Sequence, residues 1–512
     1  MRELTRTEVI AGVVAATVVG ALVRGLPVFR ADFPLHDGGL LYAMADDLRS
    51  NGFALPAFTS YNGGHIPFAY PPLALYLAAA LGALGVPLTT VLQYLPLVLS
   101  VTSIPLVFLV ARALLSDRHA LVAAFAFALM PSAYDWIIVG GGLTRAVGLV
   151  LGLLAIWQAT LLTAKPVWWR AVLAGVLGGL TVLAHPYAAA FAVISVGLIF
   201  AWRARTAASW RDAGIALAVA TLVVAPWVWA VASQHGLEPL LSGGGSRSQV
   251  GVSVASLLFE DVTGATFSVF LGIALIGFLV ELARRRYLLP VWLVVTFVVL
   301  VGGGWIMPML PMSMLISVAL VDAVIPSISS FRSEQTGRSP VPVVLAGLLG
   351  AGLLASLGVG YVIITPLWPL STDQRAAMTW IENQTPRSAT FAVVTGQPWA
   401  LDTTSEWFPA LTGRQSLGTA QGYEWTDMWS QRVDEAVALQ SCASTGEKTC
   451  LAGWSQTLGV KPDYVYVAKG PQLGPLSPDD CCPALRQALR GSGAVVYDGP
   501  GATILRWSSV AP

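Results

Sequence analysis

Charged residues are scarce in this chain. Asp, Glu, Lys and Arg make up 11% of its 512 residues, whereas roughly 25% is usual in soluble domains. This scarcity excludes a cytosolic enzyme, a disordered chain and a nucleic-acid-binding protein. The charges cancel to a net +1, so no strong overall field attracts partners of one sign.

Cysteine is equally rare, and all four cysteines lie in the C-terminal part: Cys442, Cys450, Cys481 and Cys482. They form no Cys-x-x-Cys motif, which argues against a zinc site of that kind. An even number confined to one region is typical of disulfides made in an oxidising compartment. The alternative is four unpaired small hydrophobic side chains, and the spacing alone does not fix a connectivity.

Apolar residues are abundant: 55% of the chain is hydrophobic and the mean hydropathy is +0.69. A membrane-spanning helix needs about 20 apolar residues, so the composition predicts a polytopic α-helical membrane protein. Roughly eleven segments are candidate spans: Val9–Phe29, Thr89–Leu115, Ala120–Tyr134, Ala146–Ala164, Ala171–His185, Tyr187–Ala201, Ala213–Ala232, Phe267–Leu282, Tyr287–Gly304, Pro308–Ile325 and Val341–Thr365.

A further apolar stretch, Pro71–Gly85, is short for a span. The positive-inside bias supports leaving it out. Arg2 and Arg6 place the N-terminus in the cytoplasm, and without this span nearly all later basic clusters, such as Arg284–Arg286, fall on that side too. We therefore expect Pro71–Gly85 to be a surface-lying or re-entrant helix of a multi-pass protein in the cell membrane.

This topology gives a membrane domain of residues 1–365 and an extracytoplasmic domain of residues 366–512. Two loops of the membrane domain, residues 30–88 and 233–266, also lie outside. Past Pro369 the charge density rises and the apolar runs shorten. A helix is expected from Asp373 until just before Pro386, and short β-rich runs follow, which predicts an α/β domain. These runs are Thr390–Thr395, Tyr464–Val467 and Ala494–Tyr497.

The first outer loop carries the densest set of polar residues. Asp37 follows His36 and stands at the start of an amphipathic helix expected from Gly38 to Ser50. Asp37 is either a catalytic carboxylate at the outer end of the first span or a simple helix cap. His65 follows in a segment rich in Gly, Pro and aromatics, where it either binds a phosphate or is merely solvated.

The order of these features resembles the GT-C superfamily, membrane glycosyltransferases that use polyprenyl-phosphate-linked sugars. Three features of this sequence carry the resemblance. They are Asp37 beyond the first span, the helix begun by Tyr70-Pro71-Pro72-Leu73, and the span that contains Leu95–Leu109. Relatives include protein O-mannosyltransferases, aminoarabinose transferases and oligosaccharyltransferases. The resemblance implies an inverting transfer on the outer membrane face with Asp37 as general base, and it makes Tyr70 and His36 candidate site residues. Family members often carry a second acidic residue in this loop, whereas Gly38 follows Asp37 here.

A second polar segment precedes the fourth span. Arg145 lies on the outer side, against the charge bias, and an arginine there can hold a lipid phosphate with two hydrogen bonds. A snorkelling arginine at the interface is the alternative. The preceding glycines, Gly140–Gly142, allow a ligand to approach the backbone, and Asp135 is a candidate second acid or metal ligand.

Three more residues complete the candidates in the membrane domain. His185 lies between two spans at the outer junction, as either a functional polar group or a structural turn. Arg247 lies in a flexible Gly/Ser stretch and is a candidate phosphate ligand, although a plain linker fits equally well. Glu260 is another candidate acid. No cofactor is required, but a divalent cation, Mg²⁺ or Mn²⁺, at Asp37 and Asp135 is compatible with this chemistry.

In the C-terminal region, acids and aromatics interleave in a way that suits a glycan, lipid or protein acceptor, but an ordinary domain core fits as well. The candidates are Asp402, Glu406, Trp407, Arg414, Glu424 and Trp425. Two other functions are alternatives to the transferase. A lipid or sugar transporter, or a flippase, would favour an acid pair within the spans and an inverted repeat, and neither is evident. A non-catalytic sugar- or lipid-binding protein would keep the aromatic cluster without needing Asp37.

Overall fold

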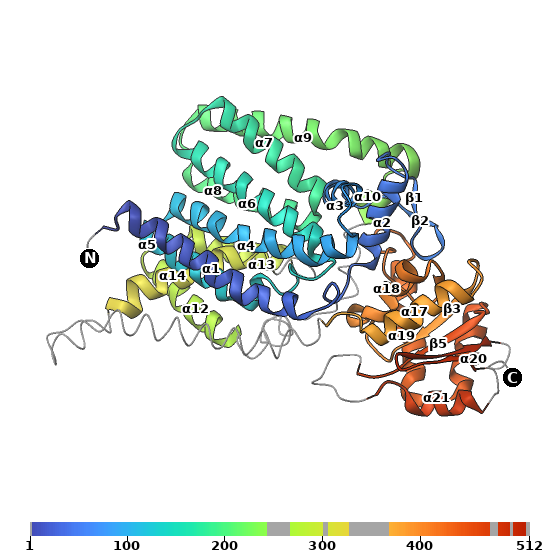
Figure 1. The fold of residues 1–512 in the computed structure, drawn as a ribbon. Coiled ribbons are helices and arrows are strands. Elements are labelled where there is room, and N and C mark those ends of the chain that lie inside the picture. Colours follow the sequence, from blue (N-terminus) through green and yellow to red (C-terminus); the bar gives the residue numbers. More distant parts are fainter. Residues whose placement is uncertain are drawn as a thin grey trace, which may run out of the picture.

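The computed structural model describes residues 3–242, 267–300, 306–326, 368–471, 480–491 and 495–507. Figure 1 shows a bundle of helices joined at one end to a smaller domain that contains a sheet. The N-terminus lies at the opposite end of the bundle. The described residues thus form a mostly helical protein with a small sheet domain.

Most helices of the bundle run side by side (Figure 1). In chain order they are α1 (Arg6–Arg30), α2 (Gly39–Ser50), α3 (Leu73–Ala83), α4 (Leu88–Leu114), α5 (Asp117–Leu129), α6 (Gly142–Ala164), α7 (Trp168–Ala184), α8 (Pro186–Arg203), α9 (Ala207–His235), α10 (Glu238–Ser242), α12 (Phe267–Ala283), α13 (Leu288–Val299) and α14 (Met309–Val318). A π-helix, Ala319–Val324, continues α14.

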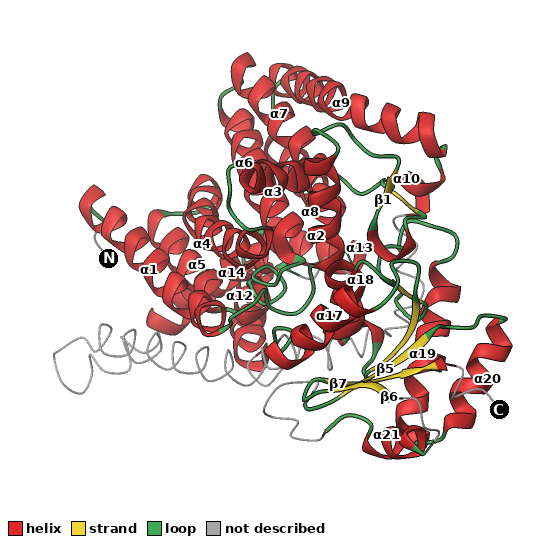
Figure 2. Cartoon of the chain, turned by 45° about the vertical axis from the view of Figure 1, so that its right-hand side comes forward, coloured by secondary structure: helices red, strands yellow, loops and turns green. Residues whose placement is uncertain are grey.

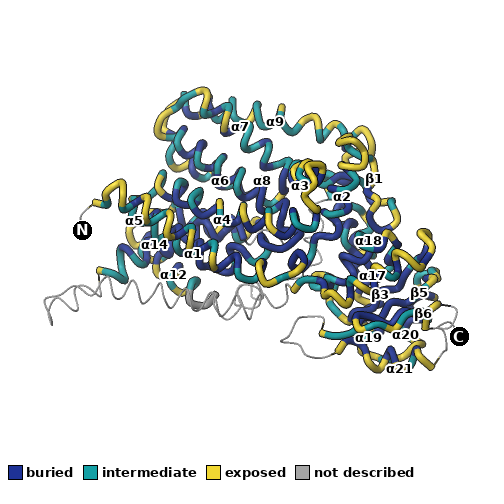
Figure 3. The backbone as a smooth tube through the Cα atoms, viewed as in Figure 1, coloured by how far each residue is buried: buried dark blue, intermediate teal, exposed yellow. Residues whose placement is uncertain are grey.

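Within the described residues, five helices are long and apolar enough to cross a membrane: α1, α4, α6, α8 and α9. Only 6% of the apolar stretch of α9 is buried in the protein, and Figure 3 shows this helix at the surface. An apolar yet exposed helix is stable when lipid covers it. The chain is therefore a membrane protein.

The predicted number of about eleven spans is not confirmed. The segment Val341–Thr365 lies outside the described residues. The predicted span Ala120–Tyr134 is wrong in its bounds, because α5 ends at Leu129. Pro131 follows and has no N–H group with which to continue the helix.

The short stretch Pro71–Gly85 forms α3, which has 11 residues and starts after Pro72. A helix of this size is about 16 Å long, much shorter than the roughly 30 Å hydrocarbon core. Figure 1 shows α3 nearly end-on, while α4 and α6 are seen from the side. A helix that lies across the spans agrees with the predicted surface position, which stays a prediction because no membrane is present.

A buried arginine joins three helices near the C-terminal end of α1. Arg24 donates to the carbonyl oxygen of Ser100 in α4 (2.6 Å) and to that of Phe127 in α5 (2.6 Å). In a continuing helix the Phe127 carbonyl would accept from residue 131, but Pro131 has no N–H group. The guanidinium also lies 5.2 Å from the ring of Tyr134. Arg24 thus completes the end of α5.

The C-terminal domain is built on a five-stranded sheet in the order β4-β3-β5-β7-β6. The strands are β3 (Thr390–Val394), β4 (Gln415–Ser416), β5 (Tyr464–Ala468), β6 (Val495–Asp498) and β7 (Ala502–Arg506). Strands β4, β3 and β5 are parallel, whereas β7 and β6 are antiparallel to their neighbours. The sequence predicted β3, β5 and β6 but missed β4 and β7.

Five helices surround this sheet: α17 (Thr372–Gln384), α18 (Thr403–Thr412), α19 (Trp429–Thr445), α20 (Lys448–Leu458) and α21 (Pro483–Arg490). In Figure 2, α18 lies nearest the bundle and α21 lies farthest from it. The cysteines pair within this domain, Cys442 with Cys450 and Cys481 with Cys482.

The C-terminal domain packs on the loop region between α1 and α4. Arg375 in α17 pairs with Asp32 at 2.6 Å. The indole N–H group of Trp425 donates to the carbonyl of Pro67 in β2 (Ile66–Pro67), which pairs with β1 (Phe58–Thr59). One continuous hydrophobic core includes buried residues of the loop and of the domain. The loop that carries Asp37 is therefore held between the spans and the domain.

Candidate active site

Asp37 lies in a tight turn between α1 and α2. Its two neighbours have positive φ angles, 52° at His36 and 140° at Gly38. Only glycine tolerates such angles at low cost, and a non-glycine residue there is held by its surroundings. Gly38 is the residue that precedes α2, and Asp37 itself makes no capping hydrogen bond to that helix. The alternative role of Asp37 as a helix cap is therefore wrong.

The glycines before α6 form the wall against Asp37. The N–H group of Gly140 donates to the carbonyl of Leu35 (2.9 Å), and that of Gly141 donates to both the carbonyl and the Oδ1 atom of Asp37 (3.0 Å each). A Cβ atom on Gly141 would lie 2.3 Å from Asp37 Oδ2. Gly140 and Gly141 are therefore needed for the close approach of the Asp37 turn.

Arg145 projects from the first turn of α6 toward the same carboxylate. Its Nη2 atom lies 3.6 Å from Asp37 Oδ2, and its Nη1 atom donates to the carbonyl of Trp136 (2.7 Å). The two side chains are 24% and 22% exposed, so both can reach a ligand. Arginine has five N–H donors, and the described contacts leave donors for an anion such as a phosphate.

The surroundings of Asp37 favour its charged form. Burial opposes ionisation, but His36, the Arg145 charge and the Gly141 N–H group together hold the pKa of Asp37 below its ordinary value. His36 Nδ1 lies 3.8 Å from Asp37 Oδ1. Neither ring nitrogen of His36 has a hydrogen-bond partner among the described residues. Asp37 is thus an ionised carboxylate beside a cation at neutral pH.

Asp135 provides a second acid with the opposite tendency. Burial raises the pKa of Asp135 to about 7, although the Trp136 N–H group donates to its carboxylate (2.7 Å) and Arg145 lies nearby. Two carboxyl groups near one arginine, one ionised and one able to hold a proton near neutral pH, are an arrangement suited to acid–base chemistry.

The rim of the site comes from both halves of the protein. The Tyr70 hydroxyl lies 3.1 Å from the Thr144 hydroxyl, and its ring lies 5.5 Å from that of Trp425. Burial raises the pKa of Glu424 to about 7, and Glu424 is close enough to contribute to the raised pKa of Tyr70. His185 is buried and accepts from the N–H group of Ala188 at the start of α8 (3.4 Å). Arg145 is close enough for its charge to act on the His185 ring.

Four of the predicted acceptor-binding residues are occupied by contacts within the protein. Asp402 caps α18 through Ser405 (2.9 Å) and binds the Thr395 hydroxyl (2.6 Å). Arg414 donates to the carbonyls of residues 382, 385 and 412. Trp407 is 0% exposed, and Glu406 accepts from the backbone at the start of α2. The predicted role in acceptor binding is therefore wrong for these four, which leaves Glu424 and Trp425.

Other candidates do not join the cluster. His65 is exposed, and in the part of the chain that the structure describes it forms no hydrogen bond or ion pair with Asp37 or Arg145. Arg247 and Glu260 lie outside the described residues. The described residues also contain no group of three His, Cys, Asp or Glu side chains that could hold a metal ion. The divalent cation that the sequence allows at Asp37 and Asp135 stays a prediction.

Several contributors were not predicted from the sequence. The Gly141 N–H group binds Asp37, Thr144 binds Tyr70, and the ring of Trp136 lies 5.6 Å from the Arg145 guanidinium. Trp136 and Gly141 belong to segments that the sequence had marked. Asp37 lies 104 residues from Gly141 and Tyr70 lies 74 residues from Thr144, so the local pattern carried no signal for these two pairings.

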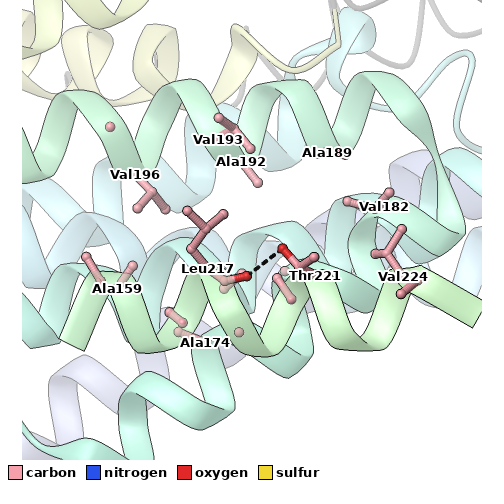
Figure 4. Close-up of a pocket in the computed structure, with 18 of the residues that line it drawn as sticks. Ala159, Ala174, Val182, Ala189, Ala192, Val193, Val196, Leu217, Thr221 and Val224 are labelled. Atoms are coloured by element: carbon pink, nitrogen blue, oxygen red, sulfur yellow. Dashed lines mark hydrogen bonds between the residues drawn. The ribbon is translucent and has the colours of Figure 1, made fainter. Parts of the chain in front are cut away.

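A cavity of about 890 Å³ lies between α6, α7, α8 and α9. Figure 4 shows it lined by small and apolar side chains, with Thr221 as an exception. The Thr221 hydroxyl donates to the carbonyl of Leu217 (3.0 Å), which satisfies it within α9. Val182 and Ala189, two of the lining residues, stand within about one helical turn on either side of His185. One end of this apolar cavity therefore lies near His185.

Comparison with known proteins gives no match by sequence and clear matches by structure. No protein-family model and no curated protein matches the sequence. The oligosaccharyltransferase AglB of Archaeoglobus fulgidus superposes with a TM-score of 0.63 at 16% identity, over 91% of this chain and 70% of that chain. It has also been solved with an inhibitory peptide and a dolichol-phosphate, and with Zn and sulfate.

Two further structures cover nearly the whole chain. ArnT from Cupriavidus metallidurans, bound to undecaprenyl phosphate, gives a TM-score of 0.56 at 15% identity over 99% of this chain and 100% of that chain. The arabinofuranosyltransferase AftD from Mycobacteria gives 0.55 at 16% identity over 100% of this chain and 42% of that chain. Identities this low show a shared fold and no more.

Proposed function

We propose that this chain, which has the fold of the GT-C glycosyltransferases, transfers a sugar from a polyprenyl-phosphate-linked donor to an acceptor hydroxyl on the outer face of the membrane. The observation that carries the proposal is the pairing of Asp37 with Arg145, an ionised carboxylate beside a partly exposed cation. Both lie where spans α1 and α6 meet the outer loop. A lipid-borne sugar would be presented at this depth.

The donor would use both polar and apolar parts of this region. Arg145 would bind the phosphate, since it keeps N–H donors for an anion. The hydrocarbon chain would lie in the apolar cavity between α6 and α9, whose outer end adjoins His185. The lipid phosphates in the complexes of AglB and ArnT support a donor of this class.

The transfer needs one base and one phosphate clamp. Asp37 removes the proton from the acceptor hydroxyl, the oxygen attacks the anomeric carbon, and the bond from that carbon to the phosphate oxygen breaks. Polyprenyl phosphate leaves with the bonding electrons, and Arg145 stabilises the charge that develops on it. A single displacement inverts the anomeric configuration. Asp135, which can hold a proton near neutral pH, donates a hydrogen bond to the sugar or the phosphate.

The acceptor would enter from the side of the C-terminal domain. Glu424, Tyr70 and Trp425 line that side and offer a carboxylate, a hydroxyl and aromatic faces, which suit a sugar-like or otherwise hydroxylated acceptor. The chain would be a multi-pass protein of the cell membrane with its N-terminus in the cytoplasm and its C-terminal domain outside. The basic clusters on one side of the predicted spans support this orientation.

The test is transfer by the purified protein in liposomes, with a panel of radiolabelled polyprenyl-phosphate sugars and a cell-envelope acceptor fraction. We expect label to move from the lipid to the acceptor and the product anomer to be inverted relative to the donor. Movement of the lipid between leaflets without transfer would instead identify a flippase. Binding without either event would identify a sugar or lipid receptor.

A further inference from the structure

The N-terminus of α2, next to Asp37, is capped by a residue of the C-terminal domain. Gly38 precedes the helix and has no side chain to cap it. Glu406 in α18 takes this place: its Oε2 atom accepts from the N–H groups of Gly38 (3.1 Å) and Gly39 (2.9 Å), and its Oε1 atom accepts from that of Leu40 (3.0 Å). A carboxylate is the group that the unpaired N–H groups of a helix start bind best.

The residue before Asp37 is held from the same helix. The indole N–H group of Trp407 donates to the carbonyl of His36 (2.8 Å). The Trp407 ring is fully buried and lies 4.7 Å from that of Phe33. The backbone is thus fixed by Trp407 immediately before Asp37 and by Glu406 immediately after it.

The contact leaves no room for adjustment. A Cβ atom on Gly39 would lie 2.6 Å from the carbonyl oxygen of Glu406. That same oxygen accepts from the Tyr61 hydroxyl (2.6 Å), and Glu406 is only 4% exposed. Glu406 is therefore shielded from an acceptor, and its carboxylate is occupied by the backbone of the Asp37 turn.

The turn needs such support because of its conformation. His36 is not a glycine, so its positive φ angle of 52° persists only where surrounding contacts determine it. Neither Asp37 nor Gly38 supplies those contacts within α2. On the bundle side, Gly140 and Gly141 bind the turn, and on the other side Glu406 and Trp407 bind it.

We propose that Glu406 is a positioning residue for Asp37, so that the docked C-terminal domain sets the geometry of the base. This inference rests on the proposed function, since it assigns Asp37 the role of base. Glu406 acts through the backbone and touches no substrate. The C-terminal domain then completes the active site in addition to contributing acceptor contacts.

The experiment compares Glu406→Ala and Glu406→Gln with the full-length wild type in liposomes. The matched control is Asp463→Asn, which weakens backbone and hydroxyl contacts to Thr390 in the same domain, away from the turn. We expect Glu406→Ala to lower kcat about 10²-fold, as expected for a displaced catalytic group, with the donor KM within about twofold of wild type. Glutamine keeps one oxygen for the N–H groups of Gly38 and Gly39, so it should restore much of kcat. The control should keep wild-type kcat.

Hydrogen–deuterium exchange gives a readout that does not depend on transfer. We expect faster exchange of the amides of residues 38–40 in Glu406→Ala, partial protection in Glu406→Gln and none of this change in Asp463→Asn. Wild-type kcat in Glu406→Ala, or unchanged exchange at residues 38–40, would overturn the inference. So would an equal loss of kcat in the control, because the effect would then be general destabilisation. Absence of transfer by the wild type, with the exchange pattern as expected, would instead refute the proposed function alone.

Discussion

Two carboxyl groups meet at the same turn, and they differ in exposure and in the groups that they face. Asp37 is 22% exposed, faces Arg145 at 3.6 Å and accepts one backbone N–H group. Glu406 is 4% exposed and accepts three backbone N–H groups. Burial, followed by the proximity of Asp37, raises the pKa of Glu406 to about 8. One acid is open to a substrate, whereas the other is closed in by the protein.

The comparison shows why residue type is a poor guide to function in this chain. In the sequence, Asp37 and Glu406 both follow polar neighbours and precede apolar helical runs. What separates them is the partner: a partly exposed cationic side chain for Asp37 and backbone N–H groups for Glu406. A carboxylate whose oxygens accept hydrogen bonds from the protein stabilises the structure. A partly exposed carboxylate beside a cation remains available for chemistry.

The largest effect is expected from Asp37→Asn. Asparagine keeps the size of the side chain and can still accept from Gly141, so folding and donor binding should be close to wild type. It cannot take up the acceptor proton, so kcat should fall by about 10²–10⁴-fold. Steady-state transfer, with thermal unfolding as the control, measures both. Wild-type turnover would remove Asp37 from the mechanism and make Asp135 the next candidate base.

The next effect tests the bundle side of the turn. In Gly141→Ala the new Cβ atom would meet the Asp37 carboxylate at 2.3–2.7 Å, so the turn must shift. A displacement of about 1 Å is expected to cost about 10²-fold in kcat. Gly214→Ala in α9, where nothing lies within 4 Å of the new atom, is the matched control and should transfer like wild type. Equal rates in the two variants would show that the close approach is unimportant.

A smaller effect, about 10- to 100-fold, is expected for donor binding in Arg145→Ala, because a hydrogen bond to a charged group contributes about 1.5–3 kcal/mol. The acceptor KM should change less.

The pH dependence of Arg145→Ala gives a second test. A general base works when deprotonated, so transfer is present above its pKa and is lost as the pH falls through it. Arg145 lowers the pKa of Asp37, so its removal should move the acidic limb of the rate profile to higher pH. An unmoved limb would contradict this pairing.

The smallest effect on transfer is expected from the disulfide that is remote from the turn. Replacing Cys442 and Cys450 together by alanine opens a short loop, which should lower the free energy of unfolding of the domain by about 2–3 kcal/mol. Turnover at 25 °C should stay near wild type, because neither residue contacts the turn in the described structure. Urea denaturation followed by Trp fluorescence measures the free energy of unfolding, and the transfer assay measures turnover. A large loss of turnover would show that transfer also depends on α19, which carries Cys442.

Local sequence patterns correctly predicted the helices and strands whose bounds depend on neighbouring residues. The helix from Asp373 to before Pro386 forms as α17, with Ser371 and Gln374 as a capping box. The helix after Asp37 ends at Ser50, followed by Asn51, as the sequence indicated. The short β-rich runs at Thr390–Thr395 and Tyr464–Val467 also predicted β3 and β5. In each case residues within a few positions supply the hydrogen bonds or the apolar face.

Contacts between residues far apart in the chain could not be predicted from the sequence. The partners of Glu406 lie 366–368 residues away, and nothing near either end indicates the pairing. The sequence grouped Glu406 with Glu424 as acceptor ligands, although only Glu424 lies at the rim. Strand β7 was missed because its identity depends on pairing with β5 and β6. The disulfide connectivity likewise depends on the fold.

The central claim is that a lipid phosphate binds beside Asp37. The most direct measurement is an experimental structure of the protein in lipid nanodiscs with a non-hydrolysable polyprenyl-phosphate sugar. We predict phosphate density within about 3 Å of the Arg145 guanidinium, the anomeric carbon facing Asp37, and the hydrocarbon chain in the cavity between α6 and α9. Phosphate density at another site, with Arg145 still paired only to Asp37 and Trp136, would contradict the account.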